Sequence, residues 1–500
     1  MKKATVNSSL AIQLIDLLNR NDIRYCHWKS NVSLADALSG GQDLDLLVAR
    51  KALPEVMKIL AELRFKAAMV KPGSNVPGIF HYYGLDLESG KTIHVHLFSS
   101  VLTGESFVKS HLLPLGKMLL ENRSRIGEVK VPSRSAELVL FIVRAFIKHG
   151  SLLDLTRIAR KPEELSSELH WLQEGSDIAE AVGLLKKYCP VIDEPLFVKC
   201  VSALDGKRSL AKRVMLALVV RRRLRIYAKY SYLRRVLAYV PVVGARLRRR
   251  FVSNRTNKIL HAGGAIVAIV GADATGKSTL VSETSHWLGS FLAVRTAHVG
   301  KPPSSWLTWS INKSLSLARR AMPQLHHNRL EPQRQSNDPR PPQKAKVSSV
   351  PYAIRAVTLA WDRYHLLIKV RRAAANGEIV VCDRYPTETL GAMDSPRLEE
   401  RLDRAGIKTL LYNWLARLEQ RLYQRIPPPD VVLRLRVSLE TAKQRNRERT
   451  STEADDYLET RHRQSRQWHK QGIKYLHDID TERSLDETVL RVKKAIWESL

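Results

Sequence analysis

The sequence has little cysteine and no long hydrophobic run. Four cysteines occur among 500 residues, and none forms a Cys-x-x-Cys pair, so neither a disulfide framework nor a zinc site is indicated. The first residues lack the apolar segment of a signal peptide, and no stretch approaches the roughly 18–20 apolar residues of a membrane span. These absences favour a protein of the reducing cytosol that is neither secreted nor membrane-spanning.

Acidic residues are missing from one long stretch. The formal net charge is +33, and between Gly206 and Lys258 there are seventeen Lys or Arg residues and no Asp or Glu. This concentration of positive charge predicts an anionic partner. Nucleic acid, an anionic surface at the inner face of the membrane and a phosphorylated substrate all fit. A solvated basic linker fits the same pattern.

The length and the periodicities predict several domains. Single hydrophobic cores rarely grow beyond about 250–300 residues, so 500 residues indicate two or three domains. We expect a small α/β domain over 1–150, a helical and strongly basic connector over 151–262, and an α/β domain with a parallel sheet over 263–500. Within the last domain, the polar and Pro-rich stretch 323–347 is expected to be an inserted loop.

The most specific motif is Gly-Ala-Asp-Ala-Thr-Gly-Lys-Ser-Thr, from Gly271 to Thr279. It matches G-x-x-x-x-G-K-[ST], a loop whose backbone N–H groups surround nucleotide phosphates while its lysine reaches the β/γ-phosphates and its hydroxyl reaches Mg²⁺. An apolar stretch over 265–270 predicts a buried strand before the loop. Apolar residues at helical spacing after the loop predict a helix that begins there. The expected phosphate-binding residues are Gly271, Asp273, Thr275, Gly276, Lys277, Ser278 and Thr279.

Two further patterns in the same domain suit phosphoryl transfer. An apolar strand from Glu378 ends in Asp383 and Arg384, where a carboxylate can orient Mg²⁺ or the acceptor and a guanidinium can clamp a phosphate. Arg363 lies on the helix expected before this strand, where it is either solvated or functional. A helix over 440–450 carries arginines that either close over the transferred phosphoryl group or pair with its own glutamates: Arg445, Arg447 and Arg449.

In their order along the chain, these motifs resemble the thymidylate kinase-like family of P-loop kinases over about residues 263–500. The resemblance implies that ATP and Mg²⁺ are the cofactors, held by Lys277 and Ser278, and that Asp273 reaches the acceptor. It further implies that Asp383 assists the transfer and, with Ser278, binds the metal. The acceptor phosphate would be bound by Arg363 and Arg384, and the transition-state arginine would be Arg445, Arg447 or Arg449.

The chain departs from that family in the acceptor site. His298-Val-Gly-Lys-Pro-Pro303 stands where the family has Arg-Glu-Pro-Gly, and Thr389-Leu-Gly-Ala-Met-Asp394 stands where it has a Tyr-Gln element. Our leading hypothesis is an ATP-dependent kinase with a nucleoside monophosphate-type acceptor. The alternatives are a kinase for a sugar or glycan hydroxyl, and a non-catalytic, nucleotide-gated module that binds nucleic acid or anionic membrane. A homodimer is compatible with all three.

The first domain carries a second pattern of carboxylates. Asp43 and Asp45 alternate on one face of an expected strand, as two ligands of one metal require. With Trp28-Lys29-Ser30 upstream, they resemble the nucleotidyltransferase fold of the DNA polymerase beta type over about residues 1–120. Histidines stand where that family has its third carboxylate, so Asp86 would have to replace it, or the domain binds a nucleotide or glycan without catalysis.

Overall fold

The computed structural model describes residues 9–70, 76–104, 109–149, 162–204, 210–230, 258–303, 305, 308–310, 350–390, 392–401, 406–448 and 453–500. The chain divides into two compact units, residues 1–261 and 262–500, each with its own sheet. The fold is therefore mixed α/β, as the sequence predicts. The expected insertion at 323–347 and most of the basic stretch lie outside the described residues.

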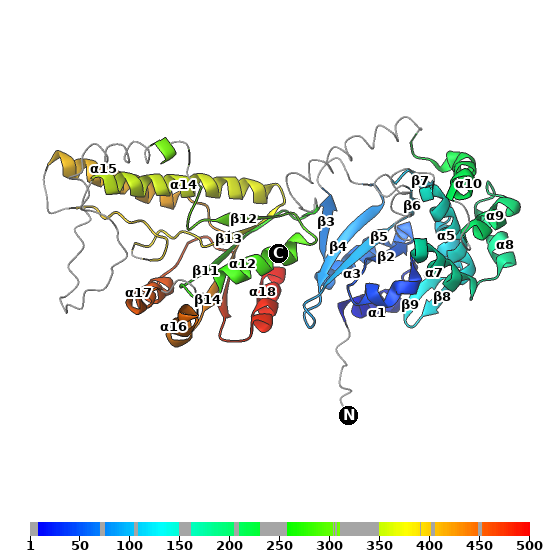
Figure 1. The fold of residues 1–500 in the computed structure, drawn as a ribbon, viewed down its shortest axis with the longest axis horizontal. Helices are drawn as coiled ribbons and strands as arrows, with labels where there is room; N and C mark the ends of the chain where they lie inside the picture. The colour runs from blue at the N-terminus through cyan, green and yellow to red at the C-terminus, as the bar shows by residue number, and fades with distance from the viewer. Residues whose placement is uncertain are drawn as a thin grey trace, which may run out of the picture. The chain divides into compact units, whose positions relative to one another are not determined.

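The first unit is built on a six-stranded mixed sheet (Figure 1). β2 and β5 run parallel, and every other neighbouring pair is antiparallel. In spatial order the strands are β1 (Tyr25–His27), β2 (Leu44–Val48), β5 (Thr92–Phe98), β4 (Ile79–Leu85), β3 (Lys66–Val70) and β10 (Lys258–Leu260). The strand expected to carry Asp45 is confirmed as β2.

Side-chain alternation gives this sheet two different faces. On one face, apolar side chains of β2, β4 and β5 pack with α1 (Leu10–Arg20) and α3 (Leu53–Glu62) in a single cluster. Because successive strand residues point to opposite sides, the other face carries Asp45, His81, His94 and His96. One hydrophobic layer thus holds the sheet while the second face presents polar groups.

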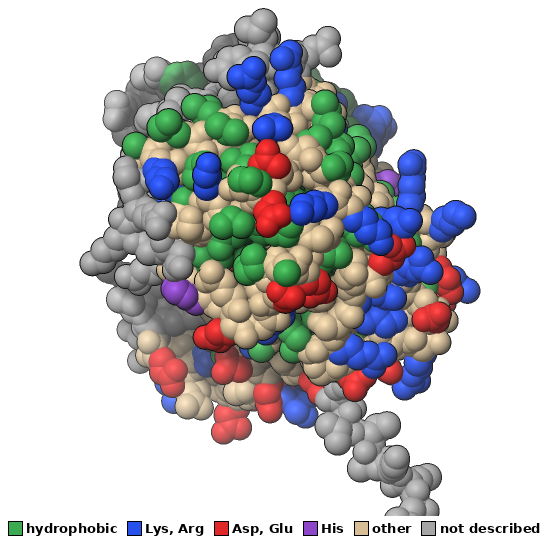
Figure 2. All heavy atoms as spheres, turned by 90° about the vertical axis from the view of Figure 1, so that its right-hand side faces the viewer, with side chains coloured by type: hydrophobic (Ala, Val, Ile, Leu, Met, Phe, Trp, Pro, Cys, Tyr) green, Lys and Arg blue, Asp and Glu red, His purple; other side chains and the backbone are tan. Residues whose placement is uncertain are grey.

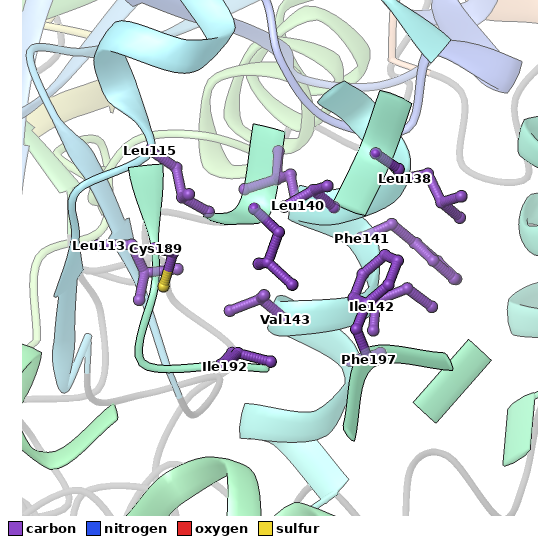
Figure 3. Packing of buried hydrophobic residues seen from close by; sticks show 14 of the residues in the cluster. Leu113, Leu115, Leu138, Leu140, Phe141, Ile142, Val143, Cys189, Ile192 and Phe197 are labelled. Atoms are coloured by element: carbon purple, nitrogen blue, oxygen red, sulfur yellow. The ribbon is translucent and has the colours of Figure 1, made fainter. Parts of the chain in front are cut away.

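A helical layer completes the first unit. Its central helix, α5 (Arg134–His149), is apolar on nearly all sides and is buried accordingly. The side of the unit that carries α8 to α10 is seen from outside in Figure 2, and Figure 3 shows α5 side chains packed against residues such as Leu113, Cys189 and Phe197. The surrounding helices are α4 (Gly116–Glu121), α7 (Pro162–Gln173), α8 (Ile178–Tyr188), α9 (Glu194–Leu204) and α10 (Leu210–Arg223).

Short elements link the sheet to this layer. Two hairpins form, β6 (Val101–Thr103) with β7 (His111–Leu113) and β8 (Arg123–Ile126) with β9 (Val129–Pro132). The remaining pieces are α2 (Leu34–Leu38), η1 (Asn31–Ser33), η2 (Arg50–Ala52) and η3 (Leu224–Tyr227).

The second unit is a five-stranded sheet in which all strands run parallel. Its spatial order is β12 (Val294–His298), β13 (Ile379–Asp383), β11 (Ile266–Gly271), β14 (Val431–Arg436) and β15 (Tyr475–Asp480). β11 is central and every one of its residues is buried, because both faces of a parallel sheet are covered. The carboxyl ends of the strands therefore meet at one edge, where ligands bind in open α/β sheets.

Helices cover both faces of this parallel sheet (Figure 1). On one face lie α14 (Val350–Ala375) and α15 (Ile407–Gln424), whose Leu367 and Tyr423 share a buried cluster with Ile266 of β11. On the other face α12 (Lys277–Gly289) packs with α18 (Leu485–Ser499), where the Trp287 and Trp497 rings lie 6.2 Å apart. Two shorter helices, α16 (Leu439–Arg447) and α17 (Asp455–Arg466), follow β14.

Candidate functional site

The phosphate loop joins β11 to α12 at the carboxyl edge of the parallel sheet. Gly276 has a φ of 85°, a left-handed conformation that glycine adopts without the steric cost of a Cβ. Thr275 Oγ1 donates a hydrogen bond of 2.8 Å to the carbonyl oxygen of Ala272, which braces the loop from within. α12 then begins at Lys277, so its unpaired N–H groups and positive dipole end face the loop.

Lys277 is held against the loop rather than extended into solvent. Its side chain is buried, its Nζ donates a hydrogen bond to the carbonyl oxygen of Ala272, and Nζ lies 3.7 Å from Asp273 Oδ1. Burial lowers the pKa of Lys277 to about 8, although the charge of Asp273 acts to raise it. The lysine is therefore mainly protonated at neutral pH and close to losing its proton just above it.

Asp273 accepts hydrogen bonds from arginines of two distant segments. Arg384 Nη2, directly after β13, donates to Asp273 Oδ1 at 2.7 Å, and Arg461 Nε of α17 donates to Asp273 Oδ2 at 3.2 Å. Burial acts to raise the pKa of Asp273, but the charges of Lys277, Arg384 and Arg461 outweigh it and hold the pKa below its usual value. One carboxylate thus places three cations around the phosphate loop.

Asp383 provides an oxygen at the end of the neighbouring strand. β13 pairs with β11 in a register that sets Asp383 opposite Ile269, so its carboxylate lies beside the strand that enters the loop. Oδ2 lies 2.8 Å from His298 Nδ1, while the buried Oδ1 has no hydrogen-bond partner among the described residues. Mg²⁺ binds oxygen ligands and in kinases takes few from the protein, so the Ser278 hydroxyl and Asp383 suit it.

Arg363 lies in the interior of the second unit. It is 2% exposed, and its guanidinium donates to the Tyr423 hydroxyl at 2.6 Å and to Asp394 Oδ1 at 3.1 Å. It also donates to the carbonyl oxygens of Val299 and Gly300. In this structure Arg363 ties three segments together, and its role as a phosphate ligand stays a prediction.

The arginines expected to form the lid are separated by the structure. Arg445 is half-buried and donates to the carbonyl oxygen of Thr481 at 2.7 Å, whereas Arg447 is exposed and Arg449 lies outside the described residues. Besides Arg384, Arg461 of α17 also contacts the phosphate loop, and the sequence patterns did not single it out. Its sequence signal is a second arginine-rich helix, but the direction of each side chain depends on how that helix packs.

Large pockets adjoin the loop on two sides. One of about 330 Å³ is lined by Gly276, Thr279, Arg445, Thr481 and Arg483, among other residues. The other, of about 440 Å³, lies on the side of β14 and is lined by Thr275, Arg434, Arg436, His462 and Arg466, among others. The loop is therefore flanked on both sides by space bordered with basic side chains.

In the first unit, the predicted carboxylates contact Lys29 and two histidines. Asp45 Oδ1 lies 2.7 Å from Lys29 Nζ and 3.1 Å from His96 Nδ1, and Asp43 Oδ1 lies 2.6 Å from His94 Nδ1. Burial would raise the pKa of Asp45, but Lys29 and His96 outweigh it and hold the pKa well below its usual range. Burial lowers the pKa of Lys29 to about 7, against the opposing effect of Asp45.

Stacked rings continue this polar face of the first sheet. The His94 ring lies 4.4 Å from the Tyr83 ring, and His81 lies 4.5 Å from His96. Asp86 does not join them, because it accepts hydrogen bonds from the backbone N–H groups of Leu10, Glu88 and Ser89. Asp86 therefore stabilises a turn, and the assignment of Asp43 and Asp45 to a metal stays a prediction.

In the ranges that the structure describes, no three His, Cys, Asp or Glu side chains are grouped so as to hold a metal ion by themselves. Within the same ranges, no helix has the length and apolar character needed to cross a bilayer.

Comparison with known proteins found limited similarity. No protein-family model matches the chain. Over 204 residues it is 26% identical to the uncharacterized ATP-binding protein YghR of Escherichia coli (strain K12), covering 39% of this chain and 73% of that protein, with the same values for the protein of that name from Escherichia coli O6:H1. Among solved structures, deoxyadenosine kinase from M. mycoides with bound dATP is similar with a TM-score of 0.28 and 17% identity, covering 46% of this chain and 98% of that one.

Proposed function

We propose that residues 262–500 form an ATP-dependent phosphotransferase that transfers the γ-phosphoryl group of ATP to a nucleoside monophosphate-type acceptor. The observation that carries the proposal is the bonding of Asp273, within the phosphate loop, to both Arg384 and Arg461. With Lys277 they form a set of cations drawn from three segments. The similarity to an ATP-binding protein supports the part of the proposal that concerns ATP binding.

Each residue has a separate role in this reaction. The loop backbone and Lys277 bind the β- and γ-phosphates, and α12 contributes the favourable end of its dipole. Phosphoryl transfer leaves little covalent work for the protein, so catalysis consists of positioning and of neutralising charge on the transferred group. Arg384 and Arg461 stand on either side of Asp273 and supply that charge. Arg445 borders the 330 Å³ pocket, which suits the nucleoside part of ATP.

Mg²⁺, if bound, would supply positive charge that neutralises the phosphates. Ser278 and Asp383 are the residues of this chain that would hold it. Asp383 lies next to Arg384 and thereby also orients the acceptor side of the site. His298 holds Oδ2 of Asp383 in place. The bond from the γ-phosphorus to its bridging oxygen breaks, a bond to an acceptor oxygen forms, and ADP leaves.

A second acceptor class is favoured by one specific contact. Asp394 lies 3.1 Å from Arg363 and 3.5 Å from Arg384, so the two arginines expected to hold an acceptor phosphate share a carboxylate already. An acceptor without a phosphate, such as a sugar or glycan hydroxyl, requires neither arginine to be free. We therefore propose the hydroxyl of a sugar or glycan as the alternative acceptor.

ADP release from Mg²⁺-ATP, measured with a panel of nucleoside monophosphates and a panel of sugars, tests both proposals. Lys277→Ala removes the phosphate-binding cation and is expected to abolish stimulated ADP release, whereas Lys369→Ala, at an exposed site on α14, is the matched control. Stimulation by monophosphates alone supports the first acceptor, and stimulation by sugars alone supports the second. Turnover that survives Lys277→Ala unchanged would overturn the kinase proposal.

A further inference from the structure

Among the described residues, helix α10 and the turn η3 that follows it pack on the rest of the first unit mainly through one side. Ala217, Val220 and Leu224 are buried, because this side packs on α5 and α9. The opposite side faces outward. In Figure 2, hydrophobic and basic side chains lie next to one another over the upper part of this face of the unit.

The outward side of α10 carries large apolar side chains at helical spacing. Met215 is 69% exposed, Leu218 is 60% exposed and Val219 is 44% exposed, and the i, i+3, i+4 spacing sets them on one stripe. Ile226 in η3 extends the stripe and is 71% exposed. Single exposed apolar residues are ordinary, but a continuous exposed stripe of this kind marks an interaction surface.

Exposed cations border the stripe. Lys212, Arg222 and Arg225 are exposed side chains on the same side as the apolar residues, one helical turn or less from them. The nearest carboxylate contact is that of Asp193 with Arg223, at 3.2 Å, which neutralises a different cation. No Asp or Glu occurs between residues 206 and 258, so this stretch of sequence carries no negative charge of its own.

We propose that this α10 surface docks the protein on an anionic lipid bilayer. We define the α10 surface as Lys212, Met215, Leu218, Val219, Arg222, Arg225 and Ile226. A helix with apolar side chains flanked by Lys and Arg lies in the plane of the membrane interface, with its apolar side at the acyl boundary and its cations among the lipid phosphates.

The same residues disfavour two other occupants. Nucleic acid satisfies the cations, but it leaves four large apolar side chains facing a charged backbone, which gains nothing from them. A second copy of the chain in a two-fold arrangement covers the apolar stripe, but it sets Arg222 and its neighbours against their own equivalents. A bilayer with anionic headgroups accommodates both kinds of side chain at once.

Vesicle flotation of the full-length protein tests this proposal. The probes are vesicles of phosphatidylcholine alone and vesicles of phosphatidylcholine mixed with phosphatidylglycerol, with duplex DNA as a second polyanion. One variant removes the charges (Lys212→Gln, Arg222→Gln, Arg225→Gln), and a second removes the apolar stripe (Met215→Ser, Leu218→Ser, Val219→Ser). The matched control changes exposed residues on α8 and α9: Ile178→Ser, Val198→Ser and Lys199→Gln.

We expect binding to the anionic vesicles only. The charge variant should bind them on the order of a hundredfold more weakly, since each cation near an anionic surface contributes about fivefold. The apolar variant should bind the anionic vesicles at least about tenfold more weakly. The control should bind them as the unchanged protein does. Because all substituted residues are exposed, thermal unfolding of each variant should match that of the unchanged protein, which separates lost docking from lost folding.

Three results would overturn the proposal. One is equal binding to both kinds of vesicle or to neither. Another is binding that the apolar variant retains in full while DNA competes for it, which would identify a general polyanion site. The third is a control variant that loses as much binding as the α10 variants, which would show that binding does not depend on the α10 surface.

Discussion

At the phosphate loop, individual side chains decide the charge that a ligand meets. Lys277, Arg384 and Arg461 all contact Asp273, so each cation is oriented by the same carboxylate. Their mutual repulsion is offset while Asp273 is ionised, and its lowered pKa keeps it ionised at neutral pH. The cations are therefore arranged before a phosphate binds, which would reduce the reorganisation required by the proposed phosphoryl transfer.

The pKa of Lys277 predicts how ATP affinity depends on pH. Burial lowers this pKa to about 8, so the amine is charged below that pH and binding then needs no proton. Above it, ATP must bind with uptake of a proton, because phosphates favour the charged amine. The dissociation constant for ATP should be flat near neutrality and should rise above pH 8 by up to about tenfold per pH unit.

Calorimetric titration of ATP over a range of pH measures this dependence. Lys277→Arg keeps a charge at all these pH values and serves as the control, since an arginine does not lose its proton there. An affinity of the unchanged protein that stays constant up to the ordinary lysine pKa of 10.5 would contradict the prediction.

Arg461 is predicted to matter more than its neighbours on α17. Arg461→Met keeps the bulk of the side chain but removes the charge that bonds to Asp273, and kcat/KM for ATP turnover should fall on the order of a hundredfold. Arg463→Met, two residues along the same helix and exposed, should change it less than about twofold. Steady-state kinetics of ADP release compares them, and an equal loss in both variants would exclude a specific role for Arg461.

At the scale of the elements, most helices and strands follow from periodicity. The buried strand before the phosphate loop and the strand that ends in Asp383 both occur where their apolar patterns predict them. The helix expected over 440–450 ends at Arg447 in the described residues. What the periodicity does not predict is α17 facing the loop, because this depends on long-range packing of two short helices that carry few apolar residues.

Close packing between β11 and its neighbours predicts a strong effect at Gly264. A Cβ there would lie 2.1 Å from the carbonyl oxygen of Glu378 and 2.7 Å from that of Ala374, and neither backbone atom can move freely. Gly264→Ala should lower the free energy of unfolding of residues 262–500 by roughly 2–4 kcal/mol. Gly289→Ala, at the end of α12 with no atom within 4 Å of the added Cβ, should leave it unchanged or raise it by about 0.5–1 kcal/mol.

Differential scanning calorimetry checks this pair of glycine variants. ATP identifies the relevant transition, because a ligand raises the unfolding temperature of the unit that binds it. If both substitutions shift that transition by the same amount, the packing argument at Gly264 fails.

At the scale of the whole molecule, two separate parts of the chain contribute strands to the first sheet. After the helical layer it returns as β10, which pairs with β3 and buries Ile259 and Leu260, before residue 262 begins the second unit. Lys258 Nζ also donates to the Tyr83 hydroxyl at 2.6 Å. The last residues before the second unit therefore stabilise the first one.

Truncation on either side of β10 tests this arrangement. A fragment of residues 1–257 should be less stable than one of residues 1–261 by roughly 2–4 kcal/mol, because it loses two buried apolar side chains and leaves β3 as an open edge. Urea unfolding of the two fragments measures the difference. Identical unfolding midpoints would show that β10 adds nothing to the first unit.

The sequence by itself determined the local features of this protein. The apolar strand, the glycines and Lys277 specify a phosphate loop through contacts within a few residues, and the alternation of residues 43–48 and 92–98 specifies two strands with Asp45 and His96 on the same face. The loop and each strand depend on neighbours in the chain, which a sequence displays directly, whereas the meeting of Asp45 with His96 depends on how β2 and β5 pair. That is why these features could be predicted.

Only the tertiary structure decided which distant groups meet. It brought Arg461 to Asp273 across 188 positions, paired Arg363 with Asp394 in the interior, and set Lys29 beside Asp45. It also returned β10 to the first sheet and left the stripe of α10 uncovered. These outcomes depend on how whole helices and sheets pack, and the free energy of that packing is spread over many residues, so no local pattern in the sequence contains it.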